Sequence, residues 1–395
     1  MRRLPEFPCI GSLRAVEHLY VHVPFCARKC DYCALYSVPE FDVADSQAYP
    51  AAVFEELGRI HANTGSPLRP RTLYIGGGSP DCNPDLLETL VEGLRGRLDL
   101  SRLEEWTVEL RPIHRGSSFV RRLAKCGVNR ASMGIQTLNC AVLREVHRLP
   151  VPADIPRTIE DLRAGGIRNI GVDFIAGLPG TSPEQTLEDI RRILPSRPAH
   201  VSVYTLIVEP GTPLARRIAA GELSVPDDDA QMDALERAAR ELRNHGYARY
   251  EISNYAKRGR RCLYNLSVWR GEDYLGLGPS AASRIGYERW TNLPDVEAYL
   301  EAAQNGAPFS RERTTQSPAD DAEERFLFGL RLAEGVDPDG FAARRPDAAP
   351  LAPHWKATLA TAARQGLARR RNTRWRLTER GFEVADSVLA SLCRE

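Results

Sequence analysis

The sequence predicts an α/β protein in which a parallel-stranded, TIM-like barrel is followed by a small winged-helix-like domain. Two observations carry this prediction. Short β-rich runs alternate with helical segments through the first half of the 395-residue chain, and the last quarter contains helices around one short basic hairpin. Strands that alternate with helices of about 10–15 residues are typical of βαβ units and a parallel sheet. About six such units predict a full or partial (β/α)6 barrel, although a doubly wound sheet would give a similar pattern.

The expected strands are runs of β-branched and aromatic residues. They cover residues 19–25, 72–75, 107–110, 130–135, 169–175 and 200–207. Segments with the apolar spacing of a helix lie between them, at residues 48–62, 85–94, 119–126, 155–165 and 183–193. The last of these helices follows Ser182 and Pro183, an N-cap residue and a proline suited to the first helical turn.

The second half of the chain is less regular. A charged helix is expected at 227–245 and a strand at 247–254. The small, glycine-rich stretch 275–283 predicts a close approach of two backbone segments. Residues 305–320 are polar, contain proline and glycine, and are expected to form a linker. We therefore expect two domains, residues 1–300 and 310–395.

The carboxyl-terminal segment has the order of elements of a winged-helix module. After about residue 321 come two helical runs, a basic hairpin at 367–378 and a final helix at 379–392. Such a hairpin can contact nucleic acid, but a solvated charged surface is the commoner case. The whole chain has 53 basic and 52 acidic residues, so its net charge of +1 argues against a dedicated polyanion binder. A nucleic-acid partner is therefore not expected.

Targeting signals are not evident in the sequence. No run of about 18 apolar residues is present, so no membrane span is expected. The first residues include Arg2 and Arg3 but lack the apolar stretch of a signal peptide. These observations predict a cytoplasmic protein.

Three of the nine cysteines form a cluster at the end of the first expected strand. Cys26, Cys30 and Cys33 have the spacing C-x3-C-x2-C, whereas the other six cysteines are single. Ligation by sulfur alone selects zinc or iron–sulfur centres, and a structural zinc site would need a fourth ligand close by. Four cysteines usually hold a [4Fe–4S] cluster, so three would leave one iron open for catalysis. The cations Arg28 and Lys29 are expected to lower the pKa values of these thiols.

The cysteine cluster and a series of further motifs resemble the radical S-adenosylmethionine (SAM) family. Specifically, they are similar to the oxygen-independent coproporphyrinogen III oxidase group, which comprises HemN and HemW proteins. The resemblance runs in order from residue 19 to about residue 300, and the tail is similar to that group's carboxyl-terminal domain. It is carried by the segments 20–33, 76–80, 127–130, 132–136, 173–180, 204–212, 250–255, 265–269 and 274–278.

This resemblance implies a set of cofactors and site residues. Cys26, Cys30 and Cys33 would hold a [4Fe–4S] cluster whose open iron binds SAM, and reductive cleavage of SAM would release a 5′-deoxyadenosyl radical. Glu109 and the Gly76–Gly78 backbone would contact the SAM ammonium, Arg148 its carboxylate and Asp173 its ribose. Other expected SAM contacts are Gln136, Tyr20, Tyr32, Gly77 and Ser79. A reduced flavodoxin or ferredoxin-type protein is the expected electron donor, and a tetrapyrrole is the expected small-molecule substrate.

The sequence departs from the group's motifs mainly in the part expected to bind substrate. Tyr264 replaces a histidine that is a potential heme ligand in HemW-like chains, with Cys262 nearby, and Pro150 replaces a histidine next to Arg148. Three functions therefore stay open. The first is a HemW-like radical SAM enzyme of porphyrin or heme metabolism. The second is a methyltransferase or cyclopropanase that uses two SAM molecules. The third is a heme chaperone without oxidase activity, for which heme is an additional ligand.

Overall fold

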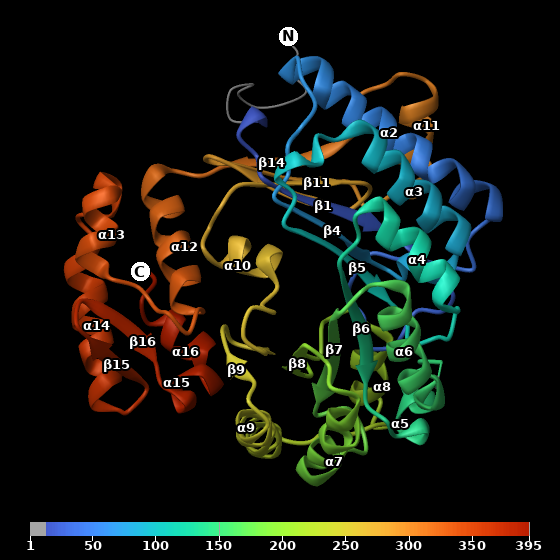
Figure 1. Ribbon diagram of the computed structural model, residues 1–395. Coiled ribbons are helices and arrows are strands. Elements are labelled where there is room, and N and C mark those ends of the chain that lie inside the picture. The colour runs from blue at the N-terminus through green and yellow to red at the C-terminus, as the bar shows by residue number, and fades with distance from the viewer. Residues whose placement is uncertain (1–12, 150, 395) are drawn as a thin grey trace.

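A single large sheet organises the barrel part of the molecule (Figure 1). The computed structural model describes residues 13–149 and 151–394. Six parallel strands lie side by side in the order of the sequence. They are β1 (His18–Val23), β4 (Thr72–Gly77), β5 (Glu105–Leu110), β6 (Arg130–Gln136), β7 (Asn169–Ala176) and β8 (His200–Thr205). A doubly wound sheet would reverse its strand order at a switch point, so this sequential order confirms the barrel-type prediction.

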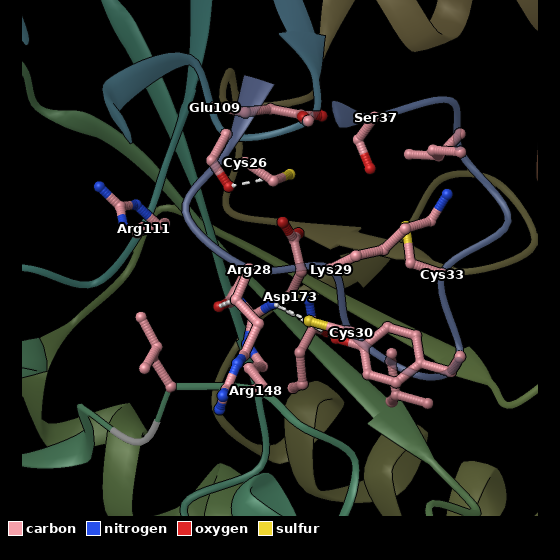
Figure 2. A pocket seen from close by; sticks show the side chains of 18 of the residues that line it. Cys26, Arg28, Lys29, Cys30, Cys33, Ser37, Glu109, Arg111, Arg148 and Asp173 are labelled. Atoms are coloured by element: carbon pink, nitrogen blue, oxygen red, sulfur yellow. Dashed lines mark hydrogen bonds between the residues drawn. The ribbon is translucent and has the colours of Figure 1, made fainter. Parts of the chain in front are cut away.

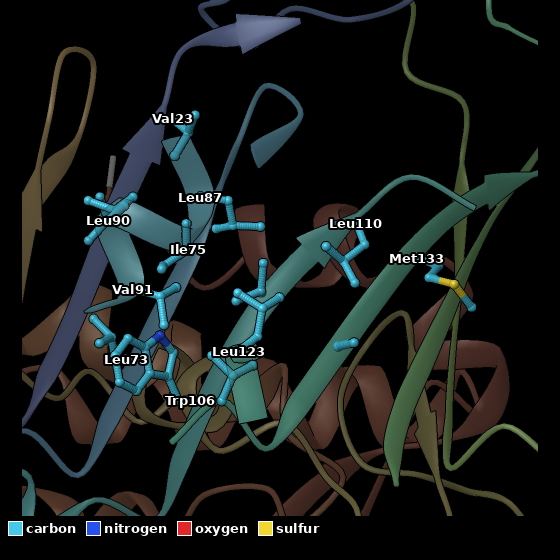
Figure 3. Close-up of a cluster of buried hydrophobic side chains, with 14 of the residues drawn as sticks. Val23, Leu73, Ile75, Leu87, Leu90, Val91, Trp106, Leu110, Leu123 and Met133 are labelled. Atoms are coloured by element: carbon cyan, nitrogen blue, oxygen red, sulfur yellow. The ribbon is translucent and has the colours of Figure 1, made fainter. Parts of the chain in front are cut away.

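Helices connect these strands and lie along one side of the sheet in Figure 1. They are α2 (Val43–Thr64), α3 (Pro84–Arg97), α4 (Ser117–Cys126), α5 (Cys140–Glu145), α6 (Ile155–Gly165) and α7 (Pro183–Ile193). The predicted N-cap is confirmed, because the Ser182 side chain accepts a hydrogen bond from the Gln185 amide. The helix-facing side chains of the strands are apolar and pack on the helices, as Figure 3 shows for Leu73, Ile75, Trp106, Leu87, Leu90 and Leu123.

Alternation along the strands places polar side chains on the opposite, inner face. In β5, buried Trp106 and Val108 face the helices, whereas Glu105 and Glu109 lie on the other face. By the same alternation, Arg130 of β6 lies on the inner face of the sheet. The barrel interior therefore holds charged groups, which is where a site can be built.

Additional strands extend the sheet at both edges and leave the barrel open. The full sheet has twelve strands, with β14 and β9 at its ends. The added strands are β9 (Ala248–Arg249), β10 (Asn254–Ala256), β11 (Tyr274–Leu277), β12 (Ala282–Ile285), β13 (Glu288–Asn292) and β14 (Arg311–Thr315). The predicted linker at 305–320 is therefore partly wrong, because β14 pairs with β13 within it. Polar strands of this kind are hard to recognise from the sequence because neither face of an edge strand needs to be apolar.

The glycine-rich stretch 275–283 brings two backbone segments together, as predicted. A side chain on Gly276 would lie 2.3 Å from the Ala282 carbonyl oxygen, and one on Gly278 would lie 2.7 Å from the His22 carbonyl oxygen. The expected strand at 247–254 is instead divided into β9 and β10. The glycine-rich stretch lies against the end of β1, shortly before the cysteine loop, because β11 pairs with β1 and Gly278 approaches His22.

The carboxyl-terminal residues form a second hydrophobic core, at the left of Figure 1. Its elements are α12 (Pro318–Leu330), α13 (Pro338–Arg344), α14 (Ala352–Arg364), β15 (Ala368–Arg371), β16 (Arg374–Leu377), α15 (Glu379–Glu383) and α16 (Ala385–Ala390). Phe326 and Trp355 stack at 3.8 Å between ring centroids and join α12 to α14. The basic hairpin is confirmed, whereas three helices precede it instead of two and the final helix is interrupted at Val384.

The remaining helices connect the barrel to its extensions. They are α8 (Pro213–Ala219), α9 (Asp228–Asn244), α10 (Leu263–Trp269) and α11 (Val296–Gln304). None of the helices within residues 13–149 and 151–394 is both long enough and apolar enough to cross a membrane.

Candidate active site at the carboxyl ends of the strands

The cysteine loop, residues 26–33, is held in place at both of its ends. Phe25 and Cys26 form the short strand β2 (Phe25–Cys26), which pairs with β3 (Val38–Pro39). At the other end, the buried Asp31 carboxylate accepts hydrogen bonds from Arg217 and His147, each at 2.8 Å. The main chain of Asp31 also bonds to Val146 and Leu214. The loop is therefore fixed by residues that lie far away in the sequence.

A cavity of about 390 Å³ lies beside this loop and is lined by all three clustered cysteines. Figure 2 shows Cys26, Cys30 and Cys33 around the same hollow as Glu109, Asp173 and Arg148. Cys26 Sγ lies 3.7 Å from the Ser79 hydroxyl, and Cys30 Sγ accepts a hydrogen bond from Arg148 at 3.5 Å. The loop thus presents its thiols to a space large enough for a cofactor.

The thiol pKa values differ from the sequence prediction. Burial raises the pKa of Cys26, and burial also raises the pKa of Cys33, which Lys29 lowers only as a minor contribution. Lys29 thus lowers the pKa of Cys33 as expected, but burial outweighs it, so the expected net lowering is wrong for Cys26 and Cys33. Arg28 is exposed to solvent, where its charge is screened. Metal binding would deprotonate the thiols directly.

Two half-buried carboxylates, Glu109 and Asp173, line the same cavity as the cysteine loop. Burial, with a smaller contribution from the charge of Asp173, raises the pKa of Glu109 to about 7. The Tyr74 hydroxyl, which donates to Glu109 at 2.7 Å, opposes this rise. Burial also raises the pKa of Asp173, and this rise is opposed by hydrogen bonds from Ser202 at 2.5 Å and Ser132 at 3.2 Å. Both groups face the cavity, where a bound cation or hydroxyl group could stabilise their charged forms.

Arg148 supplies the cationic side of the cavity. Its guanidinium donates to Cys30 Sγ, to the Tyr32 hydroxyl at 3.3 Å and to the Gly134 carbonyl oxygen. Gln136 lies at a bulge in β6 and has a φ of 69°, a left-handed conformation that turns the chain toward the cavity. Pro150, which replaces a histidine of the related motif, lies outside the described residues.

The structure brings most of the predicted site residues to this cavity. The lining includes Cys26, Cys30, Cys33, Tyr32, Gly77, Gly78, Ser79, Glu109, Gln136, Arg148 and Asp173. Tyr20 and Gly76 do not line it. Tyr20 packs against Tyr74 and Tyr264, and a side chain on Gly76 would lie 2.8 Å from the Glu109 carboxylate. These two residues therefore support the cavity wall from behind.

Several residues of the site could not be selected from the sequence. Arg111 lines the cavity and is held by the buried Asp81 carboxylate at 3.1 Å. Ser202 orients Asp173, and Asp31 anchors the cysteine loop. The position of Ser202 in the middle of a buried strand is the only signal in the sequence, because a buried hydroxyl needs a partner.

The cavity fits the iron–sulfur cluster that the cysteine pattern implies. Within the described ranges, no three His, Cys, Asp or Glu side chains stand close enough together to hold a single ion. A [4Fe–4S] cluster does not need such convergence, because each thiolate binds a different iron. Position 78 has no room for a residue larger than glycine, because a Cβ there would lie 3.0 Å from Cys26 Sγ and 2.6 Å from the Phe25 carbonyl oxygen. Three thiols around one hollow, with space preserved beside them, are the arrangement that the cluster requires.

Cys262, the other cysteine that the sequence singled out, lies in the barrel interior. It is fully buried, and its thiol donates to Glu105 at 3.4 Å. Tyr264 is stacked against Tyr20, with 6.2 Å between the ring centroids. Neither side chain lines the cavity. The arrangement thus gives Cys262 a packing role outside the cavity.

Comparisons with known proteins agree with this geometry. Residues 20–193 match the family model of the radical SAM superfamily, and residues 316–384 match the HemN C-terminal domain. The heme chaperone HemW of Lactococcus lactis is 33% identical over 82% of this chain and 84% of its own length. The heme chaperone HemW of Mycobacterium tuberculosis is 31% identical over 95% of this chain and 94% of its own length.

A solved structure shows the same fold. The coproporphyrinogen III oxidase HemN of Escherichia coli, described as a radical SAM enzyme, superimposes with a TM-score of 0.82 at 21% identity. The match covers 97% of this chain and 92% of the HemN chain, so both the open barrel and the carboxyl-terminal domain correspond. On the basis of these family models and relatives, the chain belongs to the HemN/HemW group of the radical SAM superfamily.

Proposed function

We propose that this protein binds a [4Fe–4S] cluster through Cys26, Cys30 and Cys33, and binds SAM beside it. The observation that carries the proposal is one cavity whose lining includes three thiols, the carboxylates of Glu109 and Asp173, and the guanidinium of Arg148. When bound, the cluster would supply the electron that cleaves SAM to methionine and a 5′-deoxyadenosyl radical. Membership of the HemN/HemW group supports a role in porphyrin or heme metabolism.

The charged side chains of the cavity suit the separate parts of SAM. Glu109 would accept from the ammonium, and the positive charge would lower the raised pKa of this carboxylate. Arg148 is already fixed by Gly134 and Tyr32 and would bind the SAM carboxylate through its remaining donor capacity. Asp173, oriented by Ser202 and Ser132, would accept from the ribose hydroxyls.

Product analysis tests this proposal. Reconstituted protein is reduced anaerobically and incubated with SAM and a porphyrinogen, and 5′-deoxyadenosine is measured by mass spectrometry. We expect 5′-deoxyadenosine in wild-type protein and none in the Cys30→Ala variant. A reduced flavodoxin or ferredoxin-type protein should replace the chemical reductant. Equal amounts of 5′-deoxyadenosine in both proteins would contradict the proposal.

The mass change of the substrate distinguishes the reactions open to this site. Loss of CO2 would indicate an oxidase, and gain of CH2 would indicate a methyltransferase or cyclopropanase that uses a second SAM. An unchanged substrate together with stoichiometric heme binding would indicate a heme chaperone. The chaperone is the second candidate, because relatives that are 31–33% identical and cover most of this chain carry that name.

A further inference from the structure

The outer face of the basic hairpin carries four arginines. In the β15–β16 register, Arg369 is paired with Arg376, and Arg371 is paired with Arg374. Because paired residues of a hairpin point to the same face, these four side chains share one surface. The other face packs on the carboxyl-terminal core through Ala368, Trp375 and Leu377.

No carboxylate of the described chain compensates for this charge. None of the hairpin arginines forms an ion pair with a residue that the structure describes. Arg374 donates instead to the main-chain carbonyl oxygens of Glu334 and Gly335, and the Nε of Arg376 is buried without an acceptor. Like charges directly opposite each other destabilise a hairpin. The hairpin arginines are thus without an acidic partner among the described residues, and their charge is available to an anion from outside.

The near-neutral charge of the whole chain conceals this local excess. Residues 348–378 contain seven lysines and arginines and no aspartate or glutamate. The rest of the chain contains 46 basic and 52 acidic residues. This continuous segment, which comprises α14 and the basic hairpin, therefore has a formal charge of +7, whereas the rest of the chain has a formal charge of −6. Such segregation produces a surface potential that the net charge of +1 does not reveal.

The shape of this segment suits duplex DNA. A two-stranded ribbon or a helix enters the major groove of B-form DNA, which is about 12 Å wide, whereas the major groove of A-form RNA is too narrow. The basic hairpin follows α14 directly, as the wing follows the third helix of a winged-helix module. The exposed positions of α14 are small or basic and include His354, Ala357, Thr361 and Arg364.

We propose that α14 and the basic hairpin bind the phosphate backbone of duplex DNA without sequence specificity. This inference does not depend on the proposed cofactor chemistry, and it replaces the expectation that the protein has no nucleic-acid partner. Arg369 and Arg371 are its main contacts, because both are exposed and their guanidinium groups have no acidic partner within the described chain.

Fluorescence anisotropy of the full chain with a labelled duplex of about 20 bp tests the proposal at about 50 mM and about 200 mM salt. We expect binding at the lower salt concentration and a steep loss at the higher one. The R369Q/R371Q variant should bind about tenfold more weakly, and its salt slope should fall by about two. The control variant R121Q/R168Q removes two other exposed arginines, on the barrel, and should bind as tightly as wild type.

Thermal unfolding separates binding from folding. Neutralising Arg369 and Arg371 relieves repulsion, so the Tm of R369Q/R371Q should equal or exceed that of wild type. If the Tm of R369Q/R371Q is lower than that of wild type, the charge-preserving variant R369K/R371K is tested for DNA binding. Retained binding supports the proposal, and lost binding overturns it. The proposal is also overturned if wild type does not bind duplex DNA at about 50 mM salt. The same holds if the control R121Q/R168Q loses as much DNA affinity as R369Q/R371Q. Binding of polyglutamate or anionic phosphatidylglycerol vesicles as tight as that of DNA would also overturn it.

Discussion

Two groups of polar and charged residues lie inside the same barrel, and they differ in accessibility. The amino-end group (Glu105, Arg130, His200, Tyr250 and Cys262) is almost entirely buried. Its members bond mainly to one another and to the α10 backbone, since Glu105 accepts from the Leu263 and Tyr264 amides and His200 bonds to Tyr250 at 2.9 Å. The carboxyl-end group (Glu109, Gln136, Arg148 and Asp173) faces the cavity. A buried charge therefore indicates a ligand site only where it also meets an open space.

The largest difference in stability is expected between matched substitutions of the two glutamates of β5. It should show which glutamate stabilises the fold and which is available to bind a ligand. Glu105→Gln should lower the free energy of unfolding by about 3 kcal/mol, because the buried Glu105 charge acts on the buried Arg130 cation and its carboxylate accepts from two α10 amides. Glu109→Gln should lower it by less than about 1 kcal/mol, because Glu109 is more stable protonated. Urea unfolding at neutral pH measures both values. Equal losses would mean that both groups are structural.

Substitution of Asp173 should affect SAM binding more than stability. Asp173→Asn should weaken SAM binding about tenfold to a hundredfold, because a charged hydrogen-bond acceptor contributes about 1.5–3 kcal/mol. The control is Asp189→Asn, which alters a buried carboxylate held by Thr137 and Leu138 outside the cavity. Calorimetry on the reconstituted protein gives both affinities. A comparable loss in the control would argue against a direct role for Asp173.

The raised pKa of Glu109 predicts a pH dependence of stability for protein to which no cofactor has been added. A folded-state pKa of about 7, above the ordinary value of 4.5, means that the folded state holds this proton more tightly. The stabilisation that the protonated Glu109 side chain gives to the folded state is complete below about pH 4.5, and it is lost as the pH rises through about 7. Glu109→Gln should therefore show a shallower decline in unfolding free energy between pH 5 and 8. An unchanged slope would show that Glu109 titrates normally.

The smallest effect is expected at Cys262. Cys262→Ala removes a small buried group and should cost about 1 kcal/mol of stability. Heme binding, measured by absorbance titration, should stay at the wild-type level because Cys262 does not reach the cavity. A large loss of heme affinity would show that this buried cysteine becomes accessible and would move the amino-end group into the functional site.

The sequence predicted the parts of the molecule that depend on local patterns. The six parallel strands, the N-cap at Ser182 and the close approach at Gly276 follow from alternation, capping and side-chain size. The three clustered cysteines were found by spacing alone. The strand β14 was missed because its side chains are polar, and its pairing partner cannot be read from its own residues.

Other parts of the site depend on tertiary contacts. The anchoring of Asp31 by Arg217 joins residues far apart in the chain, and so does the orientation of Asp173 by Ser202. Likewise, Glu105 and Glu109 occupy equivalent faces of one strand, and only the packed structure shows which of them meets the cavity. The thiol pKa values were mispredicted because burial outweighs the neighbouring cations.

Iron analysis of the anaerobically reconstituted protein tests the central claim most directly. Wild type should contain about four irons per chain and show the broad visible absorption of a [4Fe–4S] centre. Cys30→Ala should lose the cluster, whereas Cys140→Ala, which changes a half-buried cysteine outside the cavity, should keep it. A Cys30→Ala protein with the iron content and spectrum of wild type would contradict the assignment of the cysteine loop as the cluster site.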